Sequence, residues 1–237
     1  MASGEPAQLG TMTWPELWRA APRPVLVVPV GSCEQHGPHL PLDTDTRIAT
    51  AISAGLVEAF DDASDAARSF VLAPALTITA SGEHAGFPGT LSIGTEVFER
   101  VVVELVRSAD WSAGVVLVNG HGGNAEAVQR AVALLCTEGR RVLSWWPRDP
   151  GGDAHAGCTE TSVMLAIAPN LVRRDRLTPG RTGRVAVYAE QLRREGVRAV
   201  SETGVLGDPT GSTAAHGRSL LTRWHIDLVA AVDEWSS

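Results

Sequence analysis

Short, continuously apolar runs alternate with longer segments of helical periodicity along most of the chain. The runs at residues 25–30 and 114–119 are apolar at nearly every position, which is typical of strands buried on both faces. The segments at residues 46–60, 95–108 and 125–137 repeat their apolar positions every three or four residues, which indicates amphipathic helices. This alternation predicts an α/β fold of three layers, with helices on both faces of a mostly parallel central sheet.

The same patterns predict the remaining elements. Thr13 followed by Pro15 indicates the start of a short helix, because Thr caps helices well and Pro fits the first turn. Residues 61–65 are expected to form an exposed connection. Further strands are expected at residues 69–76 and 141–146, and further helices at residues 159–168, 185–195 and 212–235.

Length and composition limit the class of protein. A chain of 237 residues fits one α/β domain, expected over residues 11–237 after a flexible tail at residues 1–10. The net charge of −7 argues against nucleic acid as a partner, since no basic stripe neutralises phosphates. No apolar run approaches the length of a membrane span, and no signal peptide is evident, so a cytoplasmic protein without a membrane partner is expected.

Cysteine and lysine usage excludes several chemistries. The three cysteines, Cys33, Cys136 and Cys158, are too few and too scattered for a disulfide framework or a thiolate zinc site. All 20 basic residues are arginine. The absence of lysine from the sequence excludes Schiff-base chemistry, a P-loop lysine and a Ser-Lys nucleophile pair.

The loop that follows the first strand, residues 31–45, concentrates carboxylates and imidazoles, which are ligands of divalent metals. Glu34 and His36 are two positions apart, so in an extended segment both side chains point the same way. Asp45 lies at the start of the following helix, where it could serve only as an N-cap. His39 and Asp43 are expected to support the ligands by hydrogen bonds.

Later loops add further polar side chains, and the carboxyl ends of parallel strands meet at one edge of a sheet. Glu83 and His84 follow the second strand, His121 the third, and His155 and Glu160 the fourth. For the turn that contains His121, a phosphate-binding role is the alternative. For Glu160 the alternative is a carboxylate that only favours a helix amino terminus. A Cys158–His155 nucleophile pair is a weaker interpretation, because no cation adjoins the thiol in sequence.

Other segments are expected to line a pocket, with ordinary turn chemistry as the alternative. They are residues 81–90 and residues 204–216, the second of which contains Asp208. Of the adjacent Trp145 and Trp146, one ring is expected to line the pocket and the other to fill the core.

The motifs together resemble the creatininase family of metal-dependent amidohydrolases. The matching text is Gly31-Ser-Cys-Glu-Gln-His-Gly-Pro-His-Leu-Pro-Leu-Asp-Thr-Asp45, Ser81-Gly-Glu-His84, Phe87-Pro-Gly-Thr90, Asn119-Gly-His-Gly-Gly-Asn124, His155-Ala-Gly157 and Glu160-Thr-Ser162. The resemblance implies a creatininase-like fold, a homo-oligomer, often a hexamer, and two adjacent divalent ions of zinc, manganese or ferrous iron. It also implies a set of site residues: Glu34, His36, Asp45, His121 and Glu160 as metal ligands, with Asp45 bridging, and His155 as the proton donor to the leaving nitrogen.

A narrower resemblance is to the mycofactocin-system branch of that family. It rests on Thr13-Trp-Pro-Glu-Leu17, Pro41-Leu-Asp-Thr-Asp-Thr-Arg-Ile-Ala49, Asp153-Ala-His-Ala-Gly157, Thr159-Glu-Thr-Ser162 and Gly204-Val-Leu-Gly-Asp-Pro-Thr210. It implies a peptidase whose substrate is a modified precursor peptide. The alternatives are an amidohydrolase of a small cyclic amide or formamide and a non-catalytic scaffold that binds metal or peptide.

Two departures from the wider family pattern qualify the resemblance. Creatininase itself takes a ligand carboxylate from just after its strand-turn histidine, where this chain has Gly122 and Gly123. Glu160 is the candidate that replaces it. Cys33 stands where Ser or Thr is more usual, which implies altered packing beside a ligand rather than altered chemistry.

Overall fold

The computed structural model describes residues 6–62 and 68–236, and within these ranges four parallel strands form one sheet. The strands are β1 (Val25–Val30), β2 (Phe70–Leu72), β3 (Gly114–Asn119) and β4 (Val142–Trp145), in the spatial order β2-β1-β3-β4. β1 and β3 pair along their whole length, from Val25 beside Gly114 to Val30 beside Asn119. The loops that follow these two strands therefore start at the same level of the sheet.

Two of the four predicted strands are confirmed at the predicted bounds, and two are shorter than predicted. The predicted strand at residues 69–76 is wrong in its second half, because β2 ends at Leu72. Pro74 has no N–H group to donate, so it interrupts the ladder shortly after the strand. Leu76 returns to the sheet through an isolated bridge to Val30.

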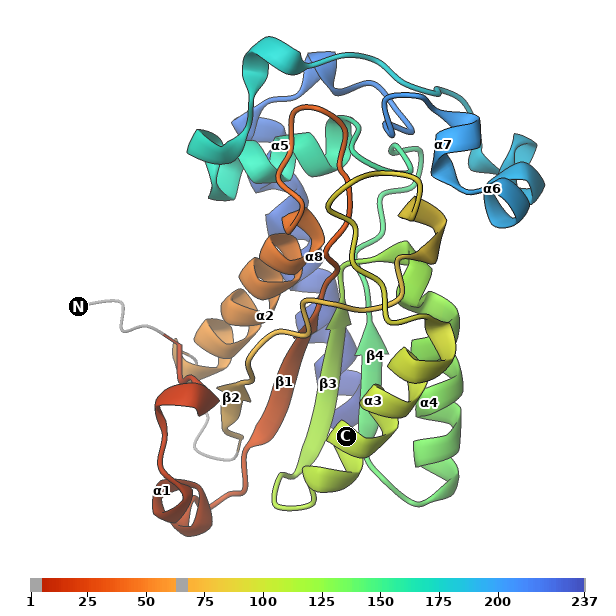
Figure 1. The fold of residues 1–237 in the computed structure, drawn as a ribbon. Helices are drawn as coiled ribbons and strands as arrows, with labels where there is room; N and C mark the ends of the chain where they lie inside the picture. The colour runs from red at the N-terminus through yellow and green to blue at the C-terminus, as the bar shows by residue number, and fades with distance from the viewer. Residues whose placement is uncertain (1–5, 63–67, 237) are drawn as a thin grey trace.

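Helices cover both faces of the sheet, which confirms the predicted three layers (Figure 1). One face carries α2 (Thr44–Asp62), α5 (Cys158–Ile167) and α8 (Ala214–Ser236), and the other carries α3 (Thr95–Ser108) and α4 (Ala125–Thr137). Alternate residues of the buried strands supply the two cores. Val116 and Val118 pack with the first group of helices, and Val115 and Leu117 pack with the second.

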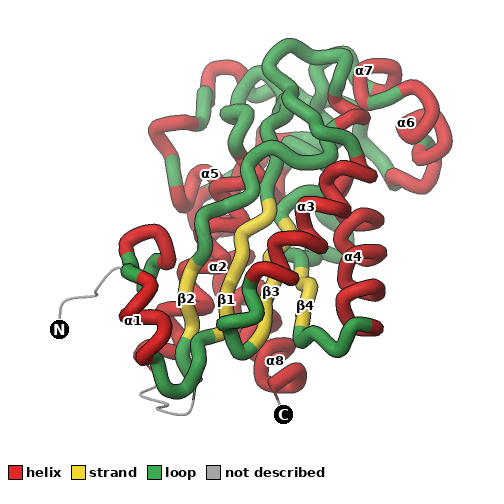
Figure 2. The backbone as a smooth tube through the Cα atoms, turned by 60° about the horizontal axis from the view of Figure 1, so that its bottom comes forward, coloured by secondary structure: helices red, strands yellow, loops and turns green. Residues whose placement is uncertain are grey.

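Shorter elements complete the chain, and those of residues 185–200 lie beyond the carboxyl ends of the strands (Figure 2). The short helix predicted at Thr13 is α1 (Trp14–Arg19), where the Glu16 carboxylate accepts hydrogen bonds from the backbone N–H and the hydroxyl of Thr13. The helix predicted at residues 185–195 is a 3-10 turn followed by α6 (Ala189–Glu195), and α7 (Val197–Val200) was not predicted. The 3-10 turns are Leu9–Thr11, Gly82–His84, Gly122–Asn124, Pro169–Leu171, Arg174–Arg176, Val185–Val187 and Pro209–Gly211.

Two predictions fall partly on residues outside the described ranges. The expected tail at residues 1–10 includes residues 1–5, which lie outside them. In the remainder of the tail, the carbonyl of Ala7 accepts a hydrogen bond from the N–H of Leu72. The expected connection at residues 61–65 lies partly outside the described ranges as well. Among the helices within these ranges, none combines the length and the apolar composition that a bilayer span requires.

The central position of β3 makes its side chains important for stability. Leu117 belongs to β3, and its side chain is fully buried in the core that the sheet forms with helices α3 and α4. Replacing Leu117 with Ala should lower the free energy of unfolding by about 2–5 kcal/mol, because the lost methyl groups leave a cavity. Urea unfolding measures the change. The matched control is Leu134→Ala on the outer face of α4, where Leu134 is 43% exposed and the expected change is within about 0.5 kcal/mol. Equal losses in the two variants would contradict the assigned core.

Candidate metal centre

The predicted convergence of polar loops is found at the carboxyl edge of the sheet. Side chains from the loops after β1, β3 and β4 and from the first turns of α2 and α5 meet there. All except Glu160 are buried, and Glu34 and His36 are completely inaccessible. The side chains are Glu34, His36, Asp45, His121, His155 and Glu160.

Asp45 lies between two groups of possible ligands. Its Oδ1 is 3.0 Å from Nε2 of His36, and its Oδ2 is 3.2 Å from Nδ1 of His121. Glu34 completes one group, with Oε2 3.2 Å from Nε2 of His121. Glu160 completes the other, with Oε2 3.9 Å from Nε2 of His36. Each group offers ligand atoms within 4.8 Å of one another, and Asp45 belongs to both groups. Two further groups of this kind contain Glu34, one with His36 and His155 and one with Glu83 and His84.

The alternative role of Asp45 as a helix cap does not match its contacts. The residue lies in the first turn of α2, which begins at Thr44. Its carboxylate accepts a hydrogen bond from the hydroxyl of Ser32 at 2.8 Å and faces the two histidines. The side chain therefore points away from the helix end and into the cluster.

The donor set fits divalent metal ions. The carboxylate of Glu34 is buried, and among the described residues neither of its oxygens has a hydrogen-bond partner. Imidazole nitrogens of His84 and His121 lie 3.3 and 3.2 Å from these oxygens, at ion-pair range. A buried carboxylate in such a position is unfavourable unless positive charge neutralises it. Carboxylate oxygen together with imidazole nitrogen suits zinc, manganese and ferrous iron.

Protons on the imidazoles balance the buried carboxylates. Burial opposes a charge on His36, but the surrounding carboxylates, Asp45 foremost, outweigh burial and raise the pKa of His36 to about 10. The pKa of His121 is raised against burial by Glu34 and Asp45 in the same way. Burial raises the pKa of the Glu160 carboxyl to about 7, although the charge of His36 opposes this shift. A metal ion would displace these protons, because ligands bind metals in their deprotonated forms.

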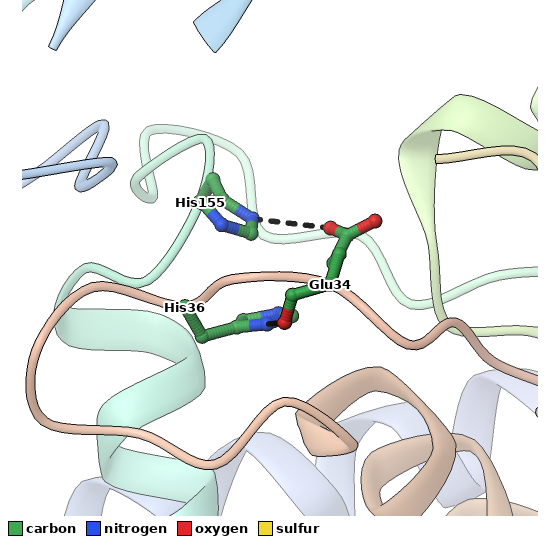
Figure 3. Close-up of side chains that lie close together, drawn as sticks. All are labelled: Glu34, His36 and His155. Atoms are coloured by element: carbon green, nitrogen blue, oxygen red, sulfur yellow. Dashed lines mark hydrogen bonds and ion pairs between the residues drawn. The ribbon is translucent and has the colours of Figure 1, made fainter. Parts of the chain in front are cut away.

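His155 lies directly beside this cluster (Figure 3). Its Nδ1 is 3.7 Å from Oε1 of Glu34, and its ring centroid is 4.3 Å from that of His36. Its Nε2 is 2.8 Å from the backbone carbonyl of Gln35. Burial and the charge of His36 lower the pKa of His155 to about 4, so the ring is neutral at pH 7. A neutral imidazole at this position can accept a proton from a reacting molecule.

Of the two residues expected to support the ligands, the structure brings His39 to the cluster but not Asp43, and Asp208, expected in a pocket wall, lies in a turn. Nε2 of His39 is 2.9 Å from the hydroxyl of Thr161, the neighbour of Glu160 on α5. Asp43 is instead half-exposed and pairs with Arg47 one turn along α2, at 2.7 Å. Asp208 accepts hydrogen bonds from the N–H and hydroxyl of Thr210, which is the turn chemistry given as its alternative.

The adjacent tryptophans lie in different surroundings. Trp145 is buried in the core, and its indole N–H donates to Asp227 at 2.8 Å. Trp146 instead lines a cavity of about 340 Å³ beside the cluster. The cavity is also lined by Asn119, His121, Asp153, Glu160 and Trp224. The two possible ligands His121 and Glu160 are thus reached from this cavity.

Glu83 and His84 lie on the other side of the cluster, on the Gly82–His84 turn. Oε1 of Glu83 is 3.4 Å from Nε2 of His121, and the hydrogen bonds and charge of His121 lower the pKa of Glu83 against the effect of burial. A Cβ atom at Gly123 would overlap the carboxylate of Glu83. With these neighbours in place, position 123 has no room for a side chain, whereas Gly122 has open space beside it.

The cysteines take no part in the cluster. Sγ of Cys158 is 3.8 Å from Nδ1 of His216 and 3.8 Å from the hydroxyl of Ser162. These contacts do not support the pair of Cys158 with His155. Sγ of Cys33 lies 3.6 Å from the carbonyl of Gly89, in the loop that packs over residues 31–45.

Two residues that contact the cluster, Ser32 and Gln35, were not predicted. Ser32 donates to Asp45, and the side-chain amide of Gln35 lies between His84 and His155. A signal for Ser32 was available, because Ser32, Glu34 and His36 alternate along an extended segment and share one side of it. No such signal was available for Gln35, because the fold alone brings His84 and His155 to it.

Comparisons with known proteins agree over nearly the whole chain. A family model described as creatininase, creatinine amidohydrolase, matches residues 10–232. The mycofactocin precursor peptide peptidase of Mycolicibacterium smegmatis is 50% identical over 232 residues, which is 97% of this chain and 92% of that protein. The creatinine amidohydrolase of Pseudomonas putida is 30% identical over 204 residues, 71% of this chain and 75% of that protein.

Solved structures give the same answer for the fold. A structure described as "Creatininase Mn" has a TM-score of 0.77 and 25% sequence identity, and the match covers 97% of this chain and 98% of that one. A mutant creatininase of "Zn-Zn type" also has a TM-score of 0.77 and 25% identity, with 98% of each chain covered.

Proposed function

The chain belongs to the creatininase family of hydrolases, and within that family we propose that it is the peptidase of mycofactocin maturation. Its substrate would be a ribosomally made precursor peptide, from which it releases the modified carboxyl-terminal dipeptide derived from Val-Tyr. The observation that carries this proposal is the 50% identity over 232 residues to a mycofactocin precursor peptide peptidase, against 30% over 204 residues to a creatinine amidohydrolase.

Two groups of ligands support a dinuclear centre of zinc, manganese or ferrous iron. Glu34, Asp45 and His121 would hold one ion, and His36, Asp45 and Glu160 the other. Bound there, such ions lower the pKa of a water molecule and polarise the scissile carbonyl. The fold already gathers these five side chains, so little rearrangement is needed.

His155 would carry the proton transfers of the reaction. Its neutral Nδ1 faces Glu34, while its Nε2 is held by the Gln35 carbonyl. Nδ1 would take a proton from the attacking water as the new C–O bond forms, and would then donate it to the leaving nitrogen as the C–N bond breaks. The products are a carboxylic acid and an amine, which ionise in water to a carboxylate and an ammonium group, and no covalent enzyme intermediate is required. This scheme agrees with a sequence that lacks lysine.

The cavity beside the cluster suits a dipeptide rich in aromatic surface. Trp146 and Trp224 supply apolar ring faces, and Asn119, Asp149 and Asp153 supply polar groups. Pockets of this kind combine apolar walls with a few polar groups that fix orientation. An amidohydrolase of a small cyclic amide or formamide is the alternative function, and it would use the same cluster with a smaller part of the cavity.

The experiment that tests the function is hydrolysis of the modified precursor peptide, followed by mass spectrometry. We expect the dipeptide and a precursor shortened by two residues, and no comparable turnover of creatinine. Turnover of creatinine or a formamide without cleavage of the peptide would favour the alternative. Binding of the peptide without hydrolysis of any of these compounds would favour a non-catalytic scaffold.

A further inference from the structure

The side chain of Gln35 is buried between two histidines of the site. Its Nε2 is 2.9 Å from Nδ1 of His84, 3.0 Å from Nε2 of His155 and 3.0 Å from the carbonyl oxygen of Gly204. Its Oε1 accepts a hydrogen bond from the N–H of Gly37 at 2.9 Å. Every polar atom of this amide therefore has a neighbour of the same site.

Two backbone groups fix the orientation of this amide. The carbonyl of Gly204 can only accept a hydrogen bond, and the N–H of Gly37 can only donate one. Exchanging the oxygen and nitrogen of Gln35 would place two acceptors together at Gly204 and two donors together at Gly37. The orientation with Nε2 toward Gly204 is thus the one that satisfies both groups.

The hydrogens of this amide can then be assigned. One of the two hydrogens on Nε2 goes to Gly204. Nε2 of His155 is 2.8 Å from the backbone carbonyl of Gln35, to which it can only donate, so it must carry a proton and cannot accept a second bond. The remaining amide hydrogen therefore goes to Nδ1 of His84. Nδ1 of His84 is then an acceptor, so its proton lies on Nε2, 3.3 Å from Oε1 of Glu34.

We propose that Gln35 is a positioning residue that, with its side chain and its backbone carbonyl, holds His84 and His155 in the Nε2–H tautomer. His84 then turns its Nε2–H toward Oε1 of Glu34, 3.3 Å away, at ion-pair range. His155 keeps Nδ1 bare toward Glu34 and His36, where a proton can be taken up.

The segment around Gly204 holds this arrangement in place. Gly204 has φ of +80°, and a Cβ atom there would overlap Oε1 of Gln35. Leu206, two residues on, pairs with His155 through backbone hydrogen bonds in both directions. The Gly204-Val-Leu-Gly-Asp-Pro-Thr210 motif thus contributes to the site through its backbone, by supporting Gln35 and His155 together.

Ring-nitrogen NMR of protein with 15N-labelled histidine tests the proposal without substrate. The chelator-treated protein is measured at pH 7, and His84→Gln and His155→Gln variants assign the two resonances. We expect protonated Nε2 and bare Nδ1 in both rings of the wild-type protein. A proton on Nδ1 of either ring would overturn the proposal.

The variant Gln35→Glu gives a second, kinetic test. A carboxylate can only accept hydrogen bonds, so Nδ1 of His84 should become protonated, and the NMR spectrum should show it. In the metal-loaded enzyme, kcat should fall by about tenfold to a hundredfold with bound metal retained and KM little changed. The control is Gln191→Glu on the exposed surface of α6, which makes the same charge change. It should alter neither the tautomer of His84 nor kcat.

An unaltered His84 tautomer in Gln35→Glu would overturn the proposal, whatever happens to kcat. The kinetic part rests on the proposed peptidase function, whereas the tautomers do not. Wild-type protein with the expected tautomers but no cleavage of the precursor would support the role of Gln35 and contradict the function.

Discussion

Asp45→Asn should abolish hydrolysis of the precursor peptide and remove bound metal from both positions. Asp45 is the residue shared by the two ligand groups, with one carboxylate oxygen beside His36 and the other beside His121. An amide has a single oxygen and no charge, so it cannot serve both groups. We expect kcat/KM to fall by about a thousandfold or more, since the loss removes metal chemistry as well as one charge. Elemental analysis and the peptide assay measure the two effects.

Asp43→Asn is the matched control for this variant. Asp43 is two residues from Asp45, and the substitution makes the same chemical change there. The Asp43 carboxylate pairs with Arg47 at the surface. Its metal content and activity should equal those of the wild-type protein. Chelation of the wild-type enzyme should reproduce the loss, and added divalent metal should reverse it. Full activity after chelation, or normal metal content in Asp45→Asn, would contradict the proposed centre.

His155→Ala should retain the metals and lose turnover. His155 faces Glu34 and His36 but belongs to neither of the two groups that share Asp45. Removing a proton-transfer group costs about a hundredfold to ten thousandfold in kcat. The measurement is single-turnover hydrolysis of the precursor alongside elemental analysis of the same sample. Because His155 also forms a possible ligand group with Glu34 and His36, loss of metal would instead make His155 a ligand.

The sequence predicted those parts of the site that depend on the sheet. β1 and β3 are continuously apolar, so their bounds and their parallel arrangement follow from periodicity. Parallel strands in one sheet place their carboxyl ends together, so the convergence of Glu34, His121 and His155 follows from the order of strands and loops along the chain. The resemblance to the creatininase family then implied the ligand set and the sharing of Asp45.

Features that depend on tertiary contacts could not be predicted in the same way. Asp43 and Asp45 are both acidic residues in one motif. Only the direction of the first turn of α2 decides that Asp45 contacts His36 while Asp43 pairs with Arg47. Gln35 carries no charge, unlike the carboxylates and imidazoles from which the site was predicted. Its neighbours His84, His155 and Gly204 are 49, 120 and 169 residues away in sequence, so no local pattern connects them.

The pairing of β1 with β3 along their whole length limits which parts of such an enzyme can change when it acquires a new substrate. Val30 and Asn119 are neighbours at the end of the ladder, so the backbones that carry Glu34 and His121 leave the sheet about 4.8 Å apart, a spacing fixed by interstrand hydrogen bonds. Inserting a residue in either strand would shift one ligand loop against the other and dismantle the centre. The cavity wall formed by Trp224 on α8 carries no such constraint from the ladder. New substrates are therefore expected to arise through changes in this wall, while the spacing of the reactive centre is inherited unchanged.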